Sequence, residues 1–237
     1  ISWALQRPCL GSLSRSLLRS LGRLDPERVR AMRAQLLGTK SEAKKAKPML
    51  ELRQLTHSMR SLCRGQVVLL VKAAPQANCS DVLHNVANVY GCDYPGRLLV
   101  IDLDSRDPMA SKSGLDSDAS VLDYLSRRLL WKQICRPRDT ERAYDFVPAP
   151  HPSDQRVVEL LGTQSFAELI TSALKIYQTI FIVGFGPEQF VENNVLLDQA
   201  TDCLLIVESP RTTFSQLLKL AAHLKGDKLV GYMHVET

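Results

Sequence analysis

The sequence predicts an α/β fold of three layers, in which helices cover both faces of a mostly parallel sheet. From Gln66 onward, short apolar runs rich in β-branched residues alternate with helical patterns. The run at 67–71 is apolar at every position, as expected of a strand that is buried on both faces of a parallel sheet. Regular alternation of strand and helix implies right-handed crossovers, which place helices on both sides of the sheet. A chain of 237 residues is long enough to bury one core of this size.

These patterns define the elements of the main domain. The strands are predicted at 67–71, 97–101, 180–183 and 203–207, with shorter ones at 146–149 and 229–233. The helices are predicted at 81–90, 120–130, 153–161, 165–176 and 213–224. Ligands bind such sheets at the carboxyl ends of the strands, so the loops after the four main strands form the candidate site.

Residues 1–60 are predicted to be a basic helical segment for docking or oligomerisation, ahead of the main domain at 61–237. Leucines recur at helical spacing from Leu10 to Leu24, while arginines line another face. This helix either packs at the edge of the domain, lies on an anionic membrane surface, or docks on a partner helix. Under the last two hypotheses, residues 1–24 attach the protein to a membrane or membrane protein, and their removal leaves the main domain folded.

Two more helices are predicted before the main domain. Asp25 suits the N-cap of the first, with Pro26 at its first helical position. A Lys-rich connector at 40–47 then leads to a helix at 49–62.

Positive charge is concentrated at the N-terminus. Residues 1–66 hold 14 Lys and Arg against 4 Asp and Glu, a net charge of +10, whereas the whole chain carries +5. A nucleic-acid arm of a partition-type protein is one interpretation. Against it, the basic residues share helices with a leucine stripe, and no aromatic platform for stacking bases accompanies them. We therefore expect an acidic partner or an anionic membrane surface, and no nucleic acid.

The sequence gives no indication of a membrane-spanning protein or of one that is stabilised by disulfides or a metal. No run of roughly 18 apolar residues is present, so we expect no membrane-spanning helix. The six cysteines lie far apart without a CxxC pair, which favours reduced thiols over disulfides and gives no metal signature.

The segment VVLLVKAAPQANCSDVL, which starts at Val67, has strand, loop and helix in the order of a phosphate-binding loop. It resembles the loop of the bacterial tyrosine kinases (BY-kinases) that serve polysaccharide export and are related to the MinD and ParA ATPases. In that family the loop reads S-x-x-P-G-E-G-K-S/T. Aligned on its proline, the loop of this chain consists of Pro75, Gln76, Ala77, Asn78, Cys79 and Ser80.

At three positions that bind phosphate in the family, this loop departs from the family pattern. Gln76 and Asn78 stand at glycine positions, where glycine lets backbone N–H groups wrap a phosphate. Cys79 stands at the lysine position and cannot supply the cation that faces the phosphates. Ser80 is kept, and it either caps the following helix or holds a metal.

The second loop, RLLVIDLDSRDP, resembles the family's second acidic motif, D-x-D-x-R-x-P. Asp102, Asp104, Arg106 and Pro108 are all in register with that motif. The resemblance implies that Asp102 and Asp104 correspond to aspartates that, in the active enzymes, are associated with Mg²⁺ and with nucleotide hydrolysis or transfer. Two carboxylates after a buried strand repel each other and need a cation or hydrogen-bond donors. Arg106 can meet that need without a metal.

The third loop, YQTIFIVGFGP, resembles the family text YDVVIIDTPP, which holds the Walker B aspartate. Val183 stands where that carboxylate belongs, and a valine cannot hold a Mg²⁺-bound water. We therefore expect no cofactor. ATP and Mg²⁺, with Ser80, Asp102 and Asp104 as metal ligands, belong to the alternative that the chain is an active enzyme.

The family also carries E-x-x-R-x-x-R on a helix ahead of the phosphate loop, where it helps to form a ring of subunits. The helix in that place offers Glu51, whereas the full spacing occurs one helix earlier at Glu27, Arg30 and Arg33. These residues are candidates for homo-oligomerisation, although the same spacing is common on charged helices.

The resemblance covers about residues 49–237 and supports two hypotheses. The first is a nucleotide-binding-deficient, cytoplasmic relative of these kinases, attached peripherally to the inner membrane. It would be the partner of an inner-membrane polysaccharide co-polymerase, a chain-length determinant, in exopolysaccharide, capsule or holdfast export. The alternative is a divergent tyrosine autokinase or MinD-like ATPase that uses Asp102 and Asp104 for catalysis.

Overall fold

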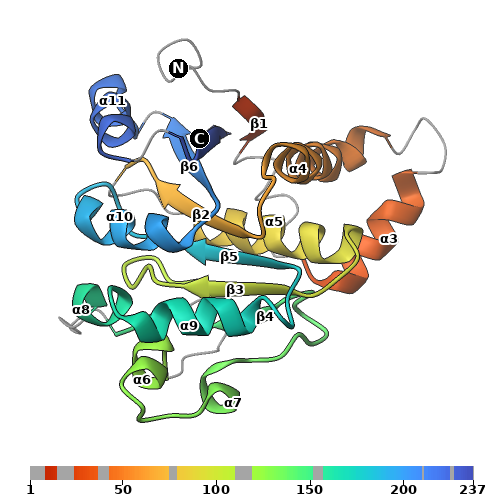
Figure 1. Ribbon diagram of the computed structural model, residues 1–237. Coiled ribbons are helices and arrows are strands. Elements are labelled where there is room, and N and C mark those ends of the chain that lie inside the picture. The colour runs from red at the N-terminus through yellow and green to blue at the C-terminus, as the bar shows by residue number, and fades with distance from the viewer. Residues whose placement is uncertain are drawn as a thin grey trace.

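The computed structural model describes residues 9–14, 24–36, 43–74, 79–109, 119–151, 157–209, 211–224 and 227–236. Within them, seven strands form one parallel sheet in the order β1-β7-β6-β2-β5-β3-β4 (Figure 1). The strands are β1 (Cys9–Ser14), β2 (Val67–Lys72), β3 (Leu98–Asp102), β4 (Asp145–Val147), β5 (Thr179–Val183), β6 (Asp202–Ser209) and β7 (Leu229–Glu236). The parallel sheet predicted from the sequence is confirmed.

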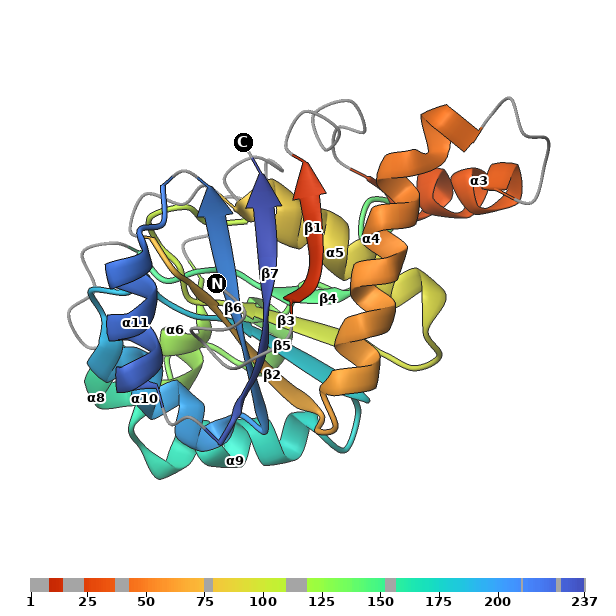
Figure 2. The ribbon, with the colours of Figure 1, turned by 90° about the horizontal axis from the view of Figure 1, so that it is seen from above.

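Helices cover both faces of this sheet and form the outer two layers. They are α3 (Pro26–Leu36), α4 (Ala43–Leu62), α5 (Ser80–Asp93), α6 (Val121–Leu125), α7 (Trp131–Ile134), α8 (Val157–Leu161), α9 (Gln164–Ala173), α10 (Phe190–Gln199) and α11 (Phe214–His223). One apolar cluster joins the sheet to α3, α4 and α5, and a second joins its other face to helices α6 to α11. Figure 2 shows α4 beside β1 and β7, and α11 beyond β6. The three-layer architecture is thus also confirmed.

The first predicted helix is wrong over its described part, because residues 9–14 form the edge strand β1. This strand pairs in parallel with β7, and Leu10 and Leu13 are both buried in the cluster beneath α4. Leucines three residues apart normally indicate a helix. Here the register of β1 against β7 shifts between Cys9 and Gly11. This irregularity allows Leu10 and Leu13, three residues apart, to face the same side of the sheet. Residues 15–23, the rest of the predicted helix, lie outside the described residues.

Helix α3 begins as the sequence predicts. The Asp25 carboxylate accepts a hydrogen bond from the backbone N–H of Arg28 at 2.7 Å, which satisfies one of the free donors of the first turn. Just before it, Leu24 is held by polar side chains of α5. Its N–H donates to Asn85 Oδ1 at 2.8 Å, and its carbonyl lies 3.2 Å from His84 Nε2. These contacts fasten the start of α3 to α5.

Helix α4 begins at Ala43, earlier than predicted, so the Lys-rich connector at 40–47 is helical from that residue onward. Alanine and lysine are strong intrinsic helix formers, and apolar periodicity alone does not detect them. Its later turns bury Met49, Leu52 and Leu55 against the sheet. The predicted boundary at residue 60 stays a prediction, although strands from both sides of it share one sheet.

The main domain differs from the prediction in its helices. Helix α6 is shorter than predicted because Arg127, just after it, has a φ of 58°, a left-handed conformation that a helix cannot continue. Helices α7 and α10 were not predicted. Helix α10 buries Leu196 and Leu197 but leaves Phe190 exposed, so its apolar residues form no single stripe. Within the described residues, no helix is long and apolar enough to cross a membrane.

Candidate functional site

Three adjacent strands end at the candidate site. In the register of the sheet, Val183 of β5 lies between Leu70 of β2 and Asp102 of β3. The loops that follow these strands therefore start side by side at the carboxyl edge, where parallel sheets bind ligands. Lys72, the last residue of β2, reaches this edge as well.

An ion cluster centred on Lys72 joins two of these loops. Its Nζ lies 2.8 Å from Asp107 Oδ2 and also contacts Asp104 Oδ2. The Lys72 side chain is 3% exposed, and burial by itself lowers the pKa of an amine. The two carboxylates outweigh that effect and raise the pKa of Lys72 above its ordinary value. Lys72 therefore stays charged.

Asp107 links this cluster to the helix that follows the phosphate loop. Its Oδ2 accepts hydrogen bonds from the backbone N–H groups of Cys79 at 2.8 Å and Ser80 at 3.0 Å. These groups belong to the start of α5, where helical N–H groups lack partners and the helix dipole favours negative charge. The carboxylate of Asp107 thus occupies the helix N-terminus at which a phosphate binds in phosphate-binding loops.

Asp102 shapes the loop that carries Asp104 and Asp107. The Asp102 side chain is fully buried and accepts hydrogen bonds from the backbone N–H of Asp104 at 3.0 Å and of Met109 at 2.7 Å. Burial raises the pKa of Asp102 to about 7, although these two N–H groups lower it and the charge of Asp104 raises it further. Both oxygens of Asp102 are therefore used to fold its own loop.

The acidic loop contacts the start of α5 through Asp107, and the prediction that Arg106 balances the charge of the aspartates is wrong. Lys72, rather than Arg106, pairs with Asp104 and with Asp107. Arg106 instead forms an ion pair with Glu188 on the loop after β5. Two features of the sequence point to this cluster: Lys72, which ends an otherwise apolar strand, and Asp107, the third aspartate of the segment DLDSRDP.

The phosphate loop is described only at its end. Pro75, Gln76, Ala77 and Asn78 lie outside the described residues. Cys79 is the N-cap of α5 and makes no side-chain capping bond. The predicted capping by Ser80 is not found, because Asp107 takes the N–H groups at this helix start. Ser80 Oγ is buried and has no hydrogen-bond partner among the described residues.

The loop after β5 offers no carboxylate at the predicted Walker B position. Val183 is buried among apolar residues, and Asn193 of α10 fastens the backbone that follows. Asn193 Oδ1 accepts from the N–H of Phe185 at 3.0 Å, and Nδ2 donates to the carbonyls of Phe185 and Gly186, each at 3.2 Å. Among the described residues, no group of three or more His, Cys, Asp and Glu could hold a metal ion.

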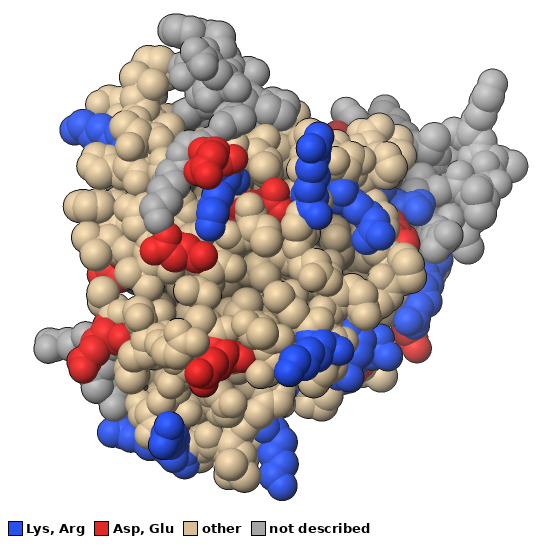
Figure 3. All heavy atoms as spheres, in the orientation of Figure 1, with Lys and Arg blue, Asp and Glu red and all other residues tan. Residues whose placement is uncertain are grey.

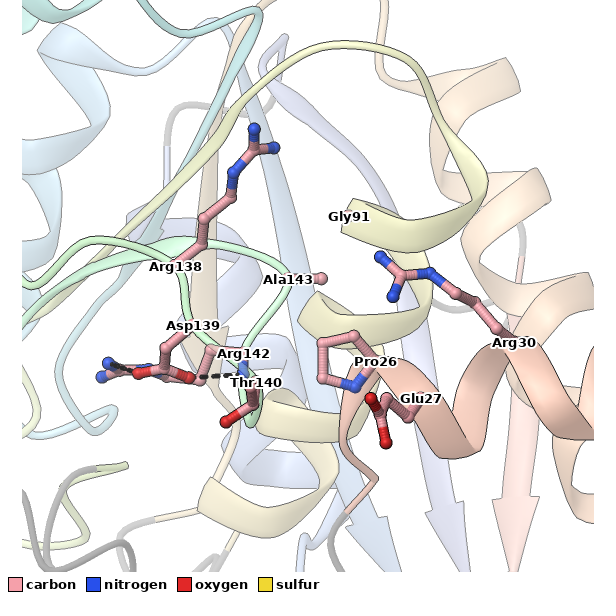
Figure 4. A pocket seen from close by; sticks show the side chains of 9 residues that line it. All are labelled: Pro26, Glu27, Arg30, Gly91, Arg138, Asp139, Thr140, Arg142 and Ala143. Carbon is pink, nitrogen blue, oxygen red and sulfur yellow. Dashed lines mark hydrogen bonds and ion pairs between the residues drawn. The ribbon is translucent and has the colours of Figure 1, made fainter.

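The oligomerisation candidates lie away from this cluster. Glu27 and Arg30 line a pocket of about 550 Å³ formed by α3, the end of α5 and the loop before β4. Figure 4 shows Arg30 pointing toward Gly91, across the pocket from Arg138. The side chain of Arg33 is not among those described, and Glu51 lies on α4 instead.

Charge is unevenly distributed over the face shown in Figure 3. Acidic side chains lie mostly on the side of α8 and α10, and basic ones are more frequent on the side of α3.

Comparison with solved structures identifies the fold. The chimerical protein CapA2B2 superposes with a TM-score of 0.78 at 18% identity, covering 99% of this chain and 96% of that one. The BceF tyrosine kinase domain gives 0.72 at 17% identity, with 99% and 96% covered. MinD from Aquifex aeolicus gives 0.53 at 14%, with 73% of this chain and 68% of that one covered.

Comparison of the sequence with known families and curated proteins found no match. At identities below 20%, the structural likeness establishes the fold and leaves activity open. The chain therefore has the P-loop fold of bacterial tyrosine-kinase domains, related to that of the MinD and ParA ATPases.

Proposed function

We propose that this protein is a nucleotide-binding-deficient relative of the BY-kinase domains that acts by binding. Its partner is an inner-membrane polysaccharide co-polymerase, and its role is in the export of exopolysaccharide, capsule or holdfast. One observation carries the proposal. Three carboxylates of the loop after β3 are already held by the protein's own donors, Asp102 by backbone N–H groups and Asp104 and Asp107 by Lys72.

This arrangement is unsuited to Mg²⁺. The ion needs several oxygen ligands and usually one or two carboxylates of the protein. Here the ammonium group of Lys72 contacts Asp104, so a divalent cation at Asp104 would be repelled. Val183 supplies no ligand from the third loop. On this proposal the site does not bind the Mg²⁺ ion that phosphoryl transfer from ATP requires.

The choice of this partner rests on structural similarity to other proteins rather than on an observed contact with a partner. The fold matches the BceF tyrosine kinase domain and a chimerical protein named CapA2B2 along nearly the whole chain. The basic N-terminal quarter suits an acidic partner or an anionic membrane surface, with residues 1–24 as the contacting segment. We place the protein in the cytoplasm, at the inner membrane, on these grounds.

The competing proposal is an active tyrosine autokinase or ATPase. The observation that favours it is Ser80, which keeps the position of the family's metal-binding hydroxyl and whose Oγ has no partner among the described residues. In an active enzyme this hydroxyl would hold Mg²⁺ between the phosphates. The enzyme proposal therefore requires the Ser80 hydroxyl, whereas the binding proposal does not.

Replacing Ser80 tests the proposal in the cell. A strain without the gene should lose polysaccharide export, and the Ser80→Ala chain should restore it to the level of the unmodified chain. Ser126→Ala is the matched control, since Ser126 Oγ is another buried hydroxyl with no partner among the described residues and lies beyond α6. Loss of export with Ser80→Ala but not Ser126→Ala, at equal protein levels, would favour the enzyme.

A further inference from the structure

We propose that Asp107 is a built-in anion that fills a phosphate-sized site, and that this site binds inorganic phosphate once the carboxylate is removed. The inference deepens the proposed function and rests on it, because it names what keeps a phosphate group out of the inactive site. The ligand class is a small tetrahedral oxyanion. The site consists of the start of α5 and the end of β2.

The hydrogen bonds to Asp107 Oδ2 have the arrangement that is found around an oxygen of a bound anion. Three donors meet at a single atom, Asp107 Oδ2: Lys72 Nζ at 2.8 Å, the N–H of Cys79 at 2.8 Å and the N–H of Ser80 at 3.0 Å. A lysine ammonium combined with successive backbone N–H groups at a helix start is the arrangement that holds a phosphate oxygen. These donors come from the strand and helix that flank the loop, so they do not depend on its glycine positions.

The occupying carboxylate comes from a separate loop. Asp107 lies 28 residues beyond Cys79 in the chain and reaches the helix from the loop after β3. Its side chain is 16% exposed, whereas that of Lys72 is 3% exposed, so the carboxylate is the more solvent-accessible member of the pair. An external anion can therefore replace the carboxylate without entering the core.

A further donor in the same turn is unused. Ser80 is 2% exposed, and its Oγ has no hydrogen-bond partner among the described residues. A carboxylate offers two oxygens, whereas a phosphate offers up to four. Ser80 Oγ can therefore donate to an oxygen of a phosphate that the smaller internal anion lacks. A buried hydroxyl left unpaired is costly, which makes this turn better suited to the larger anion.

The internal anion explains why the unmodified protein should not bind phosphate. A free phosphate would have to displace a carboxylate that the chain holds at a high effective concentration. It would also approach two negative charges, Asp104 and Asp107, that Lys72 alone balances within the cluster. Removing Asp107 eliminates the internal competitor and one of the two negative charges, and leaves Lys72 paired with Asp104.

The test is a phosphate titration of purified Asp107→Ala, followed by the NMR signals of the Cys79 and Ser80 amides at constant ionic strength. We expect both signals to shift and saturate, with phosphate bound at least about tenfold more tightly than by the unmodified protein. Glu188→Ala is the control, because it removes one carboxylate at the same edge whose partner is Arg106 rather than the helix. It should behave as the unmodified protein does.

Two results would overturn the inference. One is an Asp107→Ala protein whose Cys79 and Ser80 amides do not respond to phosphate. The other is an unmodified protein that binds phosphate equally well. If Asp107→Ala does not fold, Asp107→Ser keeps a small polar group while removing the carboxylate, and the same gain relative to the unmodified protein is required of it.

The outcome is independent of the export experiment. Failure of the phosphate titration with Ser80→Ala still active in export would remove the inference and leave the proposed function standing. Loss of export with Ser80→Ala would count against the proposed function, whatever Asp107→Ala binds. The two claims therefore fail separately.

Discussion

Lys72 and Asp107 form an ion pair of 2.8 Å between the end of β2 and the loop after β3, and the same carboxylate oxygen accepts the N–H groups that open α5. The pair thus joins a central strand, an acidic loop and a helix N-terminus through one atom. In a phosphate-binding protein these elements would converge on the ligand. Here they converge on a side chain of the protein.

Replacing Lys72 should destabilise the fold strongly. Lys72→Met leaves Asp104 and Asp107 close together without their cation, and breaking a buried pair in this way costs about 3–5 kcal/mol. Arg106→Met is the matched control, because Arg106 is half exposed and such pairs contribute at most about 1 kcal/mol. Urea denaturation of both variants measures the difference. Similar small losses in both would show that the Lys72 cluster does not stabilise the protein.

Asp102 should make stability depend on pH. Its pKa is about 7 in the folded protein against 3.8 for an unperturbed aspartate, so between these values the folded state keeps a proton that the unfolded chain releases. The contribution of Asp102 to stability is therefore present at low pH and declines as the pH rises to about 7. Asp102→Asn removes this decline.

The stability of Asp102→Asn relative to the unmodified protein should consequently rise with pH. The difference in unfolding free energy should grow by about 1.4 kcal/mol per unit between pH 5 and pH 7, and level off above that. Urea denaturation at four pH values measures it. A difference that stays constant from pH 5 to pH 8 would contradict a raised pKa at Asp102.

The edge strand β1 should contribute to the stability of the whole sheet. Leu13 is 1% exposed and packs in the cluster beneath α4, so Leu13→Ala should cost about 2–5 kcal/mol. Leu50→Ala is the control, because Leu50 is 47% exposed on α4 and its loss should change stability by no more than about 0.5 kcal/mol. Equal effects on thermal unfolding would show that β1 is dispensable.

This strand also changes how membrane attachment must be tested. Removing residues 1–24 would remove β1 together with the basic residues, and would expose the edge of β7. Loss of membrane association would then have two explanations. Substituting Arg15, Arg19 and Arg23 by Glu keeps β1 and reverses the charge, so it tests the proposed contact of this segment with an anionic surface more cleanly.

The main domain could be predicted because its central strands are apolar over most of their length and several of its helices have clear apolar stripes. Helix α10 lacks such a stripe, and β1 has leucines at a spacing that also fits a helix. Hydrophobic periodicity therefore predicts neither element correctly. At the site, alignment with a family pattern found Asp102, Asp104 and Val183. It did not find Lys72 or Asp107, because their roles arise from a contact between residues 35 positions apart, which a pattern along the chain does not contain.

Calorimetry of the unmodified protein with ATP and Mg²⁺ tests the central claim most directly. We predict a dissociation constant no better than millimolar. Charge-assisted hydrogen bonds to phosphate are worth about 1.5–3 kcal/mol each, so the loss of two or three can abolish a micromolar site, which totals about 8 kcal/mol. Micromolar binding of ATP, or ATP-dependent phosphotyrosine on the unmodified chain, would contradict the account and establish the kinase alternative.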